Sequence, residues 1–166
     1  MSEDKNIVIR PAYADEYETV MGLAWKTFLR FDAGDFPKQG IDSFRDFLTS
    51  ETLKKLYDTG QYPIFVAQID DQIRGVISLR NMTHISLLFV EADYHRRGIG
   101  RRLIEHVCGY VEEQLHHFMV TVNSAAYATE FYHRLGFTDL GGEIAQNGVR
   151  FTPMSLLLTN MERDGE

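Results

Sequence analysis

Apolar residues near the start of the chain recur at the spacing of an α-helix. A short apolar run over residues 7–9 predicts a strand, and the helical spacing begins a few residues later. Over residues 15–31 the apolar side chains fall three and four positions apart, which predicts an amphipathic helix with one buried face. That face comprises Tyr17, Val20, Met21, Ala24, Trp25 and Phe28.

The next stretch carries the signals of a loop and of two shorter helices. Glycine and proline residues predict a loop over residues 31–40. Asp42 is placed to cap the helix that follows, and a further helical turn or two runs to residue 57. Gly60 is then the expected terminator of this helical region.

Beyond residue 60 the pattern changes to short apolar runs, which are typical of buried strands. Residues 63–69 and 73–79 flank the turn at Asp70 and Asp71, so they predict a β-hairpin. Residues 85–90 form a third apolar run, which predicts a strand that leads into a glycine-containing loop.

Alternating helices and strands complete the chain. Helical spacing over residues 101–115 precedes an apolar run over 118–122, and a helical segment over 127–135 precedes a last strand near 154–158. This order predicts an α/β (α+β) fold. We expect a central twisted mixed sheet of about six to seven strands, with helices on both faces.

The composition is that of an ordinary globular protein without an export or membrane signal. The chain fits one domain, residues 1–166, which is large enough to form a stable core without disulfides or bound metals. No apolar run approaches the roughly 20 residues that span a bilayer, and the charged N-terminal segment lacks the apolar core of a secretion signal. The single cysteine, Cys108, cannot form an internal disulfide, so we expect a cytoplasmic protein.

The net charge narrows the classes of partner. A formal charge of −7 argues against a nucleic-acid-binding protein, because such proteins present a basic face to phosphates. An acidic protein favours encounter with cationic substrates instead. Residues 95–102 contrast with this background, since the segment carries four arginines: Arg96, Arg97, Arg101 and Arg102.

The basic segment coincides with a glycine loop that opens into a helix. Gly98 and Gly100 lack Cβ atoms, which permits a positive φ or close approach of the backbone to a ligand. The first N–H groups of the helix have no intrahelical partners and lie at the positive end of its dipole. These features predict a phosphate or pyrophosphate site. A dinucleotide fingerprint would need a third glycine where Leu103 stands.

Two segments resemble motifs of the GNAT superfamily of N-acetyltransferases. The apolar residues 88–90, followed by Tyr-His-Arg-Arg-Gly-Ile-Gly at 94–100, are similar to the family's acyl-CoA loop, which reads Gln/Arg-x-x-Gly-x-Gly/Ala. Here His95 takes the first position of that motif. The segment 131–137 resembles the end of the family's later helix, Tyr-x-x-x-Gly-Phe. The resemblance extends over nearly the whole chain and implies a GNAT-like fold and an acetyl-CoA-dependent acyltransferase.

The resemblance also implies how acetyl-CoA, the cosubstrate, is bound. In the family the strand equivalent to 85–90 separates from the strand equivalent to 118–122, and the pantetheine lies between them. The backbone of Val90 would pair with the pantetheine, and the N–H of Leu88 would face the thioester oxygen. The implied cofactor-binding residues are Leu88, Val90, His95, Arg96, Arg97, Gly98, Ile99, Gly100, Arg101 and Asn123.

Acetyl transfer to an amine involves one group that gives a proton and one that takes a proton. The resemblance places the hydroxyl of Tyr132 beside the sulfur, as the acid. His84 is the candidate base, because period-two alternation puts it on one strand face with Leu88 and Val90, and imidazole titrates near neutrality. A water chain is an alternative to any side-chain base. The reserve candidates are Glu91, Asp93 and Glu51.

The acceptor is less well defined by the sequence. By analogy with the family, the helices over 15–31 and 42–57 wall its site, and Phe31, Asp32 and Asp35 between them could touch it. We expect a small-molecule or peptide amine and direct transfer without a metal, because the histidines form no ligand cluster. Nucleic acid and membrane are not expected partners, and a homodimer is allowed for. The alternative function is a non-catalytic acyl-CoA-binding sensor of the same fold.

Overall fold

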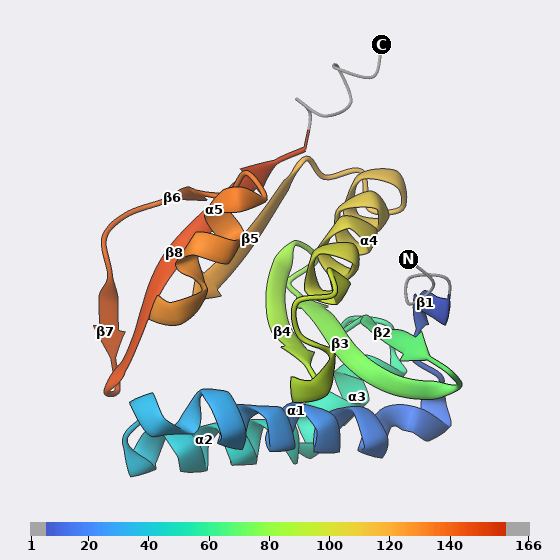
Figure 1. Ribbon diagram of the computed structural model, residues 1–166, viewed down its shortest axis with the longest axis horizontal. Coiled ribbons are helices and arrows are strands. Elements are labelled where there is room, and N and C mark those ends of the chain that lie inside the picture. Colours follow the sequence, from blue (N-terminus) through green and yellow to red (C-terminus); the bar gives the residue numbers. More distant parts are fainter. Residues whose placement is uncertain (1–5, 159–166) are drawn as a thin grey trace.

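A mixed β-sheet runs through the molecule, with two layers of helix on its faces (Figure 1). The computed structural model describes residues 6–158. The strand order is β1-β2-β3-β4-β5-β8-β6, with β7 paired to β8 beside this path. All neighbouring strands are antiparallel except β4 and β5, which are parallel. The strands are β1 Ile7–Pro11, β2 Ile64–Ile69, β3 Gln72–Arg80, β4 His84–Val90, β5 Met119–Ser124, β6 Thr138–Asp139, β7 Ile144–Gln146 and β8 Val149–Leu157.

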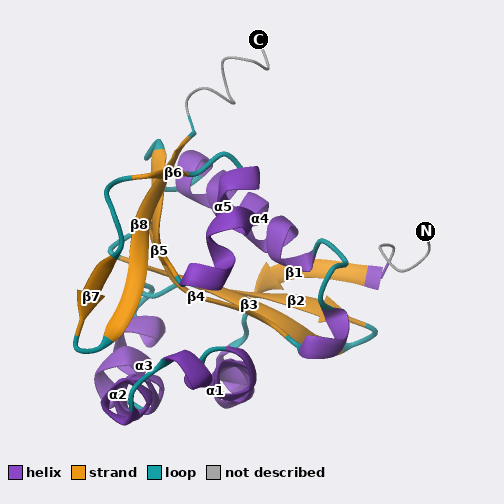
Figure 2. Cartoon of the chain, turned by 60° about the vertical axis from the view of Figure 1, so that its left-hand side comes forward, coloured by secondary structure: helices purple, strands orange, loops and turns teal. Residues whose placement is uncertain are grey.

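The helices cover both faces of the sheet, as the sequence predicts (Figure 2). One face carries α1, α2 and α3, and the other carries α4 and α5. Strand β3 packs against both helical layers, because successive side chains of a strand point to opposite faces of the sheet. Val76 packs in the apolar cluster with α1, whereas Ile77 packs in the cluster with α4. The helices are α1 Tyr17–Phe31, α2 Lys38–Leu48, α3 Glu51–Asp58, α4 Ile99–Glu113 and α5 Thr129–Arg134.

Two predicted helix starts are wrong by a few residues. Helix α2 begins at Lys38, inside the predicted loop, and Asp42 lies within it, paired with the Lys38 ammonium at 2.8 Å. Asp42 therefore supports the helix through an i,i+4 ion pair rather than as its cap. Helix α4 begins at Ile99, directly after Gly98, which adopts a left-handed conformation with φ of 77°.

A hairpin of β7 and β8 is absent from the sequence prediction. Its turn, Asn147 and Gly148, has positive φ at both residues, 56° and 81°, which is typical of a tight hairpin turn. Strand β8 starts at Val149 rather than near residue 154. Its first five residues are all exposed or half-buried, so they lack the alternation that reveals a strand. The turn packs on the start of α2, because a Cβ at Gly148 would lie 2.6 Å from Pro37 Cγ.

Gly148→Ala should destabilise the protein for two reasons. An L-residue is strained at φ of 81°, and the added methyl would clash with the Pro37 ring. We expect a loss of about 1–3 kcal/mol in the free energy of unfolding, measured by urea denaturation. Gly142→Ala, which has open space and no positive φ, is the matched control and should change stability by less than about 0.5 kcal/mol. Equal stability of both variants would show that the hairpin tip is loosely packed.

Candidate active site

A β-bulge in β4 shapes the centre of the site. On β3, Ser78 pairs with Leu87 and the next residue, Leu79, pairs with Ile85, so Ser86 is an extra residue in β4. A bulge bends its strand and increases the local twist. The parallel pairing with β5 covers His84 and Ile85 and stops there. Figure 1 shows the two strands diverging from that point toward α1 and α2.

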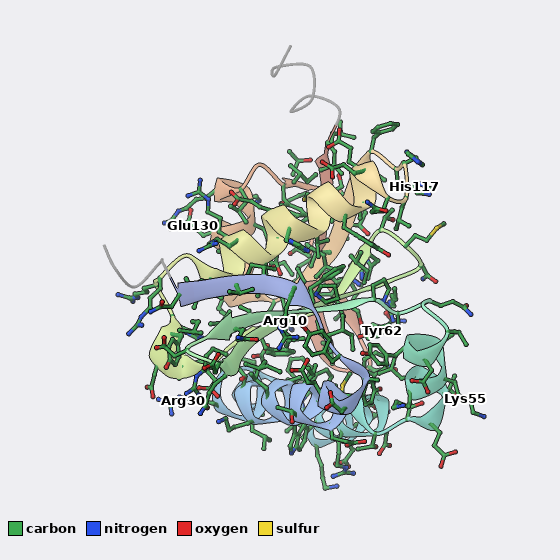
Figure 3. The ribbon with its side chains drawn as sticks, turned by 90° about the vertical axis from the view of Figure 1, so that its right-hand side faces the viewer. Arg10, Arg30, Lys55, Tyr62, His117 and Glu130 are labelled. Atoms are coloured by element: carbon green, nitrogen blue, oxygen red, sulfur yellow. The ribbon has the colours of Figure 1, made fainter. Side chains whose placement is uncertain are left out.

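A buried chain of hydroxyl groups holds the bulge in place. The Ser78 hydroxyl donates to the Tyr62 oxygen at 2.8 Å, and the Tyr62 hydroxyl donates to Ser86 Oγ at 2.8 Å. Tyr62 is 1% exposed, and Figure 3 shows it in the interior beside the sheet, whereas Arg30 and Glu130 lie at the surface. Because Tyr62 and Ser78 are buried and hydrogen-bonded, they fix the position of Ser86.

A cavity of about 910 Å³ occupies the space between the diverging strands. The glycine loop and the start of α4 line one part of it, β4 and the region around α5 line a second, and α1, α2 and β8 line a third. Phe31 of α1 contacts His95 of the glycine loop, so the first and third parts adjoin. The structure brings most of the predicted cofactor-binding residues to this cavity together with Tyr132. These residues are Leu88, Val90, His95, Arg96, Gly98, Ile99, Gly100, Arg101 and Asn123.

The glycine loop presents open backbone to the cavity. Gly98 has φ of 77°, and no atom lies within 4 Å of the position that a Cβ would take there. Arg96 also has a positive φ, 67°, so the chain turns sharply before α4. The first-turn amides of α4 lack intrahelical partners, and the Arg96 and Arg101 side chains add positive charge beside them. This arrangement suits a phosphate group.

His95 and Arg97 make contacts that the sequence does not reveal. The Nε2 atom of His95 lies 2.7 Å from the carbonyl oxygen of Val90, and the His95 ring packs against Phe31 with centroids 4.8 Å apart. Arg97 does not line the cavity, and its guanidinium lies 4.9 Å from the ring centroid of Tyr94. Arg97 is therefore a support for the loop rather than part of the cavity wall.

Tyr132 lies in α5 at the middle of the cavity. Its ring packs edge-on against Phe131 and Phe137, and the residue is 5% exposed. The hydroxyl makes no hydrogen bond to another residue within the described part of the chain. Burial raises the pKa of this phenol, and the negative charge of Asp32 raises it further. Tyr132 is thus a protonated hydroxyl available to a ligand at neutral pH.

The structure does not bring His84 into the cavity. The bulge at Ser86 reverses the alternation of β4, so His84 lies on the opposite face from Leu88 and Val90, and the predicted shared face is wrong. His84 Nδ1 instead lies 2.8 Å from Thr121 Oγ1 on β5. Burial, assisted by the nearby Arg80 charge, lowers the pKa of this imidazole. His84 is a neutral residue that bridges the two strands where they still pair.

The reserve bases also lie outside the cavity. Glu91 is ion-paired with Arg74 at 2.9 Å and with Lys26 at 3.5 Å. Glu51 lines a separate hollow between α1 and α3, and Asp93 is exposed in the turn before the glycine loop. These three carboxylates therefore have structural or solvent-facing positions.

Asp32 is the carboxylate that does line the cavity. Burial raises its pKa to about 6, although a hydrogen bond from the Tyr127 hydroxyl opposes this effect. The Tyr127 oxygen lies 3.0 and 3.2 Å from the two carboxylate oxygens of Asp32. Phe31 also lines the cavity, as predicted for an acceptor contact, but Asp35 does not. Tyr127 gave no local sequence signal, since it lies 95 residues from Asp32.

Aromatic rings form the end of the cavity beside Asp32. Phe28 packs edge-on against Phe36, with centroids 5.0 Å apart, and in a tilted orientation against Phe44, with centroids 4.4 Å apart. The ring centroid of Phe89 lies 6.0 Å from that of Phe44. In the sequence Phe28 and Phe44 match ordinary core positions, so their place in the cavity wall could not be distinguished. Phe151 and Arg150 enter the same end from β8, through the hairpin that the sequence did not predict.

Asp32→Asn should stabilise the protein in a pH-dependent manner. Because burial favours the neutral acid, the folded protein binds this proton more tightly than the unfolded chain, and stability falls as the pH rises from about 4 through about 6. Asparagine removes the charge and keeps an acceptor for Tyr127. We expect a gain of about 0.5–1 kcal/mol at pH 7.5 and none at pH 4, after allowance for partial exposure.

Thermal denaturation at the two pH values checks this expectation. Asp35→Asn, which removes an exposed neighbouring carboxylate, is the control and should show no comparable gain. A loss of stability in Asp32→Asn at pH 7.5 would show that the folded protein favours the charged form of Asp32.

Residues 6–158 present neither a metal-binding cluster nor a membrane-spanning helix. They contain no group of three or more histidine, cysteine, aspartate or glutamate residues placed to hold a metal ion. None of their helices is long and apolar enough to cross a membrane.

Comparison with known proteins places this site in a family. The acetyltransferase (GNAT) domain family matches residues 32–158, which is more than half of the chain. No curated protein sequence matches the chain significantly.

Solved structures share the fold at low sequence identity. A GCN5-related N-acetyltransferase from Rhodopseudomonas palustris has a TM-score of 0.77 and 20% identity, with 91% of this chain and 95% of that chain covered. PaiA N-acetyltransferase from Thermoplasma acidophilum, in complex with coenzyme A, gives 0.73 and 19%, with 91% and 98% covered. A variant of the spermidine N-acetyltransferase SpeG from Vibrio cholerae gives 0.71 and 14%, with 98% and 99% covered. The family match shows that this chain belongs to the GNAT acetyltransferases and is an acyltransferase enzyme.

Proposed function

We propose that this enzyme transfers an acetyl group from acetyl-CoA directly to a primary amine. The observation that carries the proposal is one continuous cavity, which joins the basic glycine loop, the unpaired edge of β4 and the hydroxyl of Tyr132. A phosphate site, a slot for an extended chain and a proton donor thus line the same cavity. The likeness to PaiA, which is solved with coenzyme A, agrees with this use of the cavity.

The glycine loop would bind the pyrophosphate of acetyl-CoA. The residues fit this group, because Gly98 leaves open space where any side chain would intrude and α4 presents free first-turn amides. Arg96 and Arg101 would neutralise the phosphate charges. Asn123, on the facing strand β5, lines the opposite wall.

The free edge of β4 would bind the pantetheine as an additional strand does. Beyond Ile85 this edge has no partner strand, so backbone groups of Leu88 and Val90 are available for hydrogen bonds. The Val90 carbonyl has His95 as one partner and retains a second lone pair. The Leu88 N–H would donate to the thioester oxygen, where negative charge develops during attack.

Tyr132 would act as the general acid. The amine nitrogen attacks the thioester carbonyl carbon, the C–N bond forms, and the C–S bond breaks to release the thiolate. The Tyr132 hydroxyl gives its proton to the sulfur and is reprotonated from solvent. An ammonium acceptor loses two protons overall, of which one is balanced by the new thiol and the other is released to solvent. His84 is not part of this proposal, because it lies outside the cavity.

Gly98→Ala should weaken acetyl-CoA binding while the protein remains folded. The added methyl projects into the open space of the loop, where we place the pyrophosphate. We expect at least a roughly tenfold rise in the dissociation constant by calorimetry, since each factor of ten is about 1.4 kcal/mol. Gly60→Ala is the matched control: it has φ of 85° and equally open space, but lies outside the cavity. Equal affinity in Gly98→Ala would remove the loop from the binding site.

Tyr132→Phe should slow catalysis without weakening acetyl-CoA binding. Only the hydroxyl is lost, and it makes no hydrogen bond to another described residue, so the fold should persist. Loss of a general acid typically costs about 10²–10⁴ in rate, and a thiolate leaves readily, so we expect about a 100-fold lower kcat. Release of free CoA thiol under saturating acceptor measures this rate. A parental kcat would mean that the thiolate leaves unassisted.

A further inference from the structure

We propose that the acceptor is an amine that carries one ammonium group and a flat apolar group. Asp32 would bind the ammonium, and the apolar group would pack against the phenylalanine rings that line the cavity. The inference rests on the proposed acetyl transfer and deepens it by naming the class of acceptor. Three observations carry it: the rings at the α1–α2 end of the cavity, the distribution of charge along its lining, and the incomplete hydrogen bonding of Asp32.

The rings come from several elements and converge on one end of the cavity. Phe28 belongs to α1, Phe36 to the link before α2, Phe44 to α2 and Phe89 to β4. Their edge-on and tilted contacts, with centroids 4.4 to 6.0 Å apart, hold the ring orientations. A wall of fixed aromatic rings receives a flat apolar group with little loss of side-chain entropy.

The charge of the lining is uneven. Asp32 is the one carboxylate among the described residues that line the cavity. Four arginines also line it: Arg96 and Arg101 at the glycine loop and the start of α4, Arg134 at the end of α5, and Arg150 on β8. Arg134 pairs with Glu130 at 3.8 Å. Arg150 already pairs with Glu143 at 3.3 Å. One ammonium can therefore pair with one carboxylate, and a second ammonium would find no carboxylate along the described lining.

Asp32 has capacity for this ammonium. A carboxylate can accept about four hydrogen bonds, and among the described residues Tyr127 alone donates to the Asp32 side chain. Tyr127 is itself 61% exposed, so the pair lies at the mouth of the cavity, where an acceptor would enter. A half-buried carboxylate with unused lone pairs gains more from a cation than a fully solvated one does.

The same geometry disfavours other classes of amine. A polyamine would bury further ammonium groups among rings without a carboxylate, at a desolvation cost that cation–π contacts offset in part. An α-amino acid would bring its own carboxylate close to Asp32, and like charges repel at that distance. The acceptor class thus differs from spermidine, the substrate named for the SpeG structure.

Asp32 is also close to the chemistry. Its charge acts on the phenol of Tyr132, which lies in the middle of the cavity. At pH 7.5 Asp32 is mostly ionised, because its pKa is about 6. Asp32 can therefore take one proton from the bound ammonium, which frees the nitrogen lone pair for attack, and then release that proton to solvent. The second proton leaves the nitrogen after attack and is balanced by the proton that the thiol gains.

An acceptor panel tests the class. The enzyme is assayed with acetyl-CoA at pH 7.5 against 2-phenylethylamine, n-butylamine, spermidine and phenylalanine, with free CoA thiol as the readout. We expect kcat/KM for 2-phenylethylamine to exceed that of each other amine at least about tenfold, the discrimination available to a shaped apolar pocket. A higher kcat/KM with spermidine or with phenylalanine would overturn the inference.

Matched variants test the carboxylate and the aromatic rings of the site separately. Asp32→Asn should lower kcat/KM for 2-phenylethylamine about 30- to 100-fold, whereas Asp35→Asn should stay within about threefold of the parent. Phe36→Leu retains an apolar side chain and the fold. It should reduce the preference for 2-phenylethylamine over n-butylamine several-fold. Equal rates in Asp32→Asn and Asp35→Asn would remove Asp32 from the site.

Failure of this inference can be told apart from failure of the proposed function. Calorimetry with acetyl-CoA is run beside the panel. Turnover of another amine but not of 2-phenylethylamine would reject the acceptor class and leave the acetyl transfer intact. Binding of acetyl-CoA without turnover of any of the four amines would reject this class as well, and would favour the non-catalytic sensor over the proposed function.

Discussion

The free edge of β4 is the constraint on which the rest of the site depends. A strand in the middle of a sheet must satisfy its backbone N–H and C=O groups, and burial without partners is costly. Here the pairing of β4 with β5 ends at Ile85, directly before the bulge at Ser86. The edge that remains is rigid on one side, through its pairing with β3, and open on the other. Such an edge is a template for an extended polar chain, which is the chemical character of a pantetheine.

Contacts distant in sequence close the cavity around that edge. The hydrogen bond from Tyr127 to Asp32 joins the link after α1 to the segment before α5 across its mouth. The β7–β8 hairpin packs on Pro37 and brings Phe151 to the same end. The fold thus surrounds the part of the cavity around Asp32 with elements from both halves of the chain, whereas a single loop and helix start form its basic part.

This difference explains what the sequence could predict. The glycine loop is local, since Gly98, the arginines and the helix start lie within a few residues, and the structure places it in the wall of the cavity. The sheet and its two helical layers follow from the change of apolar period and are confirmed. The predicted face of His84 is wrong because one extra residue at Ser86 inverts the face of every earlier position in β4, and a serine in an apolar run is not a signal for a bulge. The Asp32–Tyr127 pair and the aromatic wall depend on tertiary contacts, for which a single sequence carries no local signal.

The separation of the two apolar clusters by the sheet has a consequence for divergence of this enzyme. The glycine loop is anchored through Ile99 and Leu103 in the cluster beneath α4, whereas Phe44 and Phe89 pack against the cluster beneath α1. Substitutions at well-separated positions without shared partners act nearly additively. The aromatic wall of the cavity can therefore accumulate changes without altering the packing beneath the glycine loop. During evolution, the acceptor specificity could change through repacking of the layer that contains α1, while the glycine loop and the packing beneath α4 stay the same.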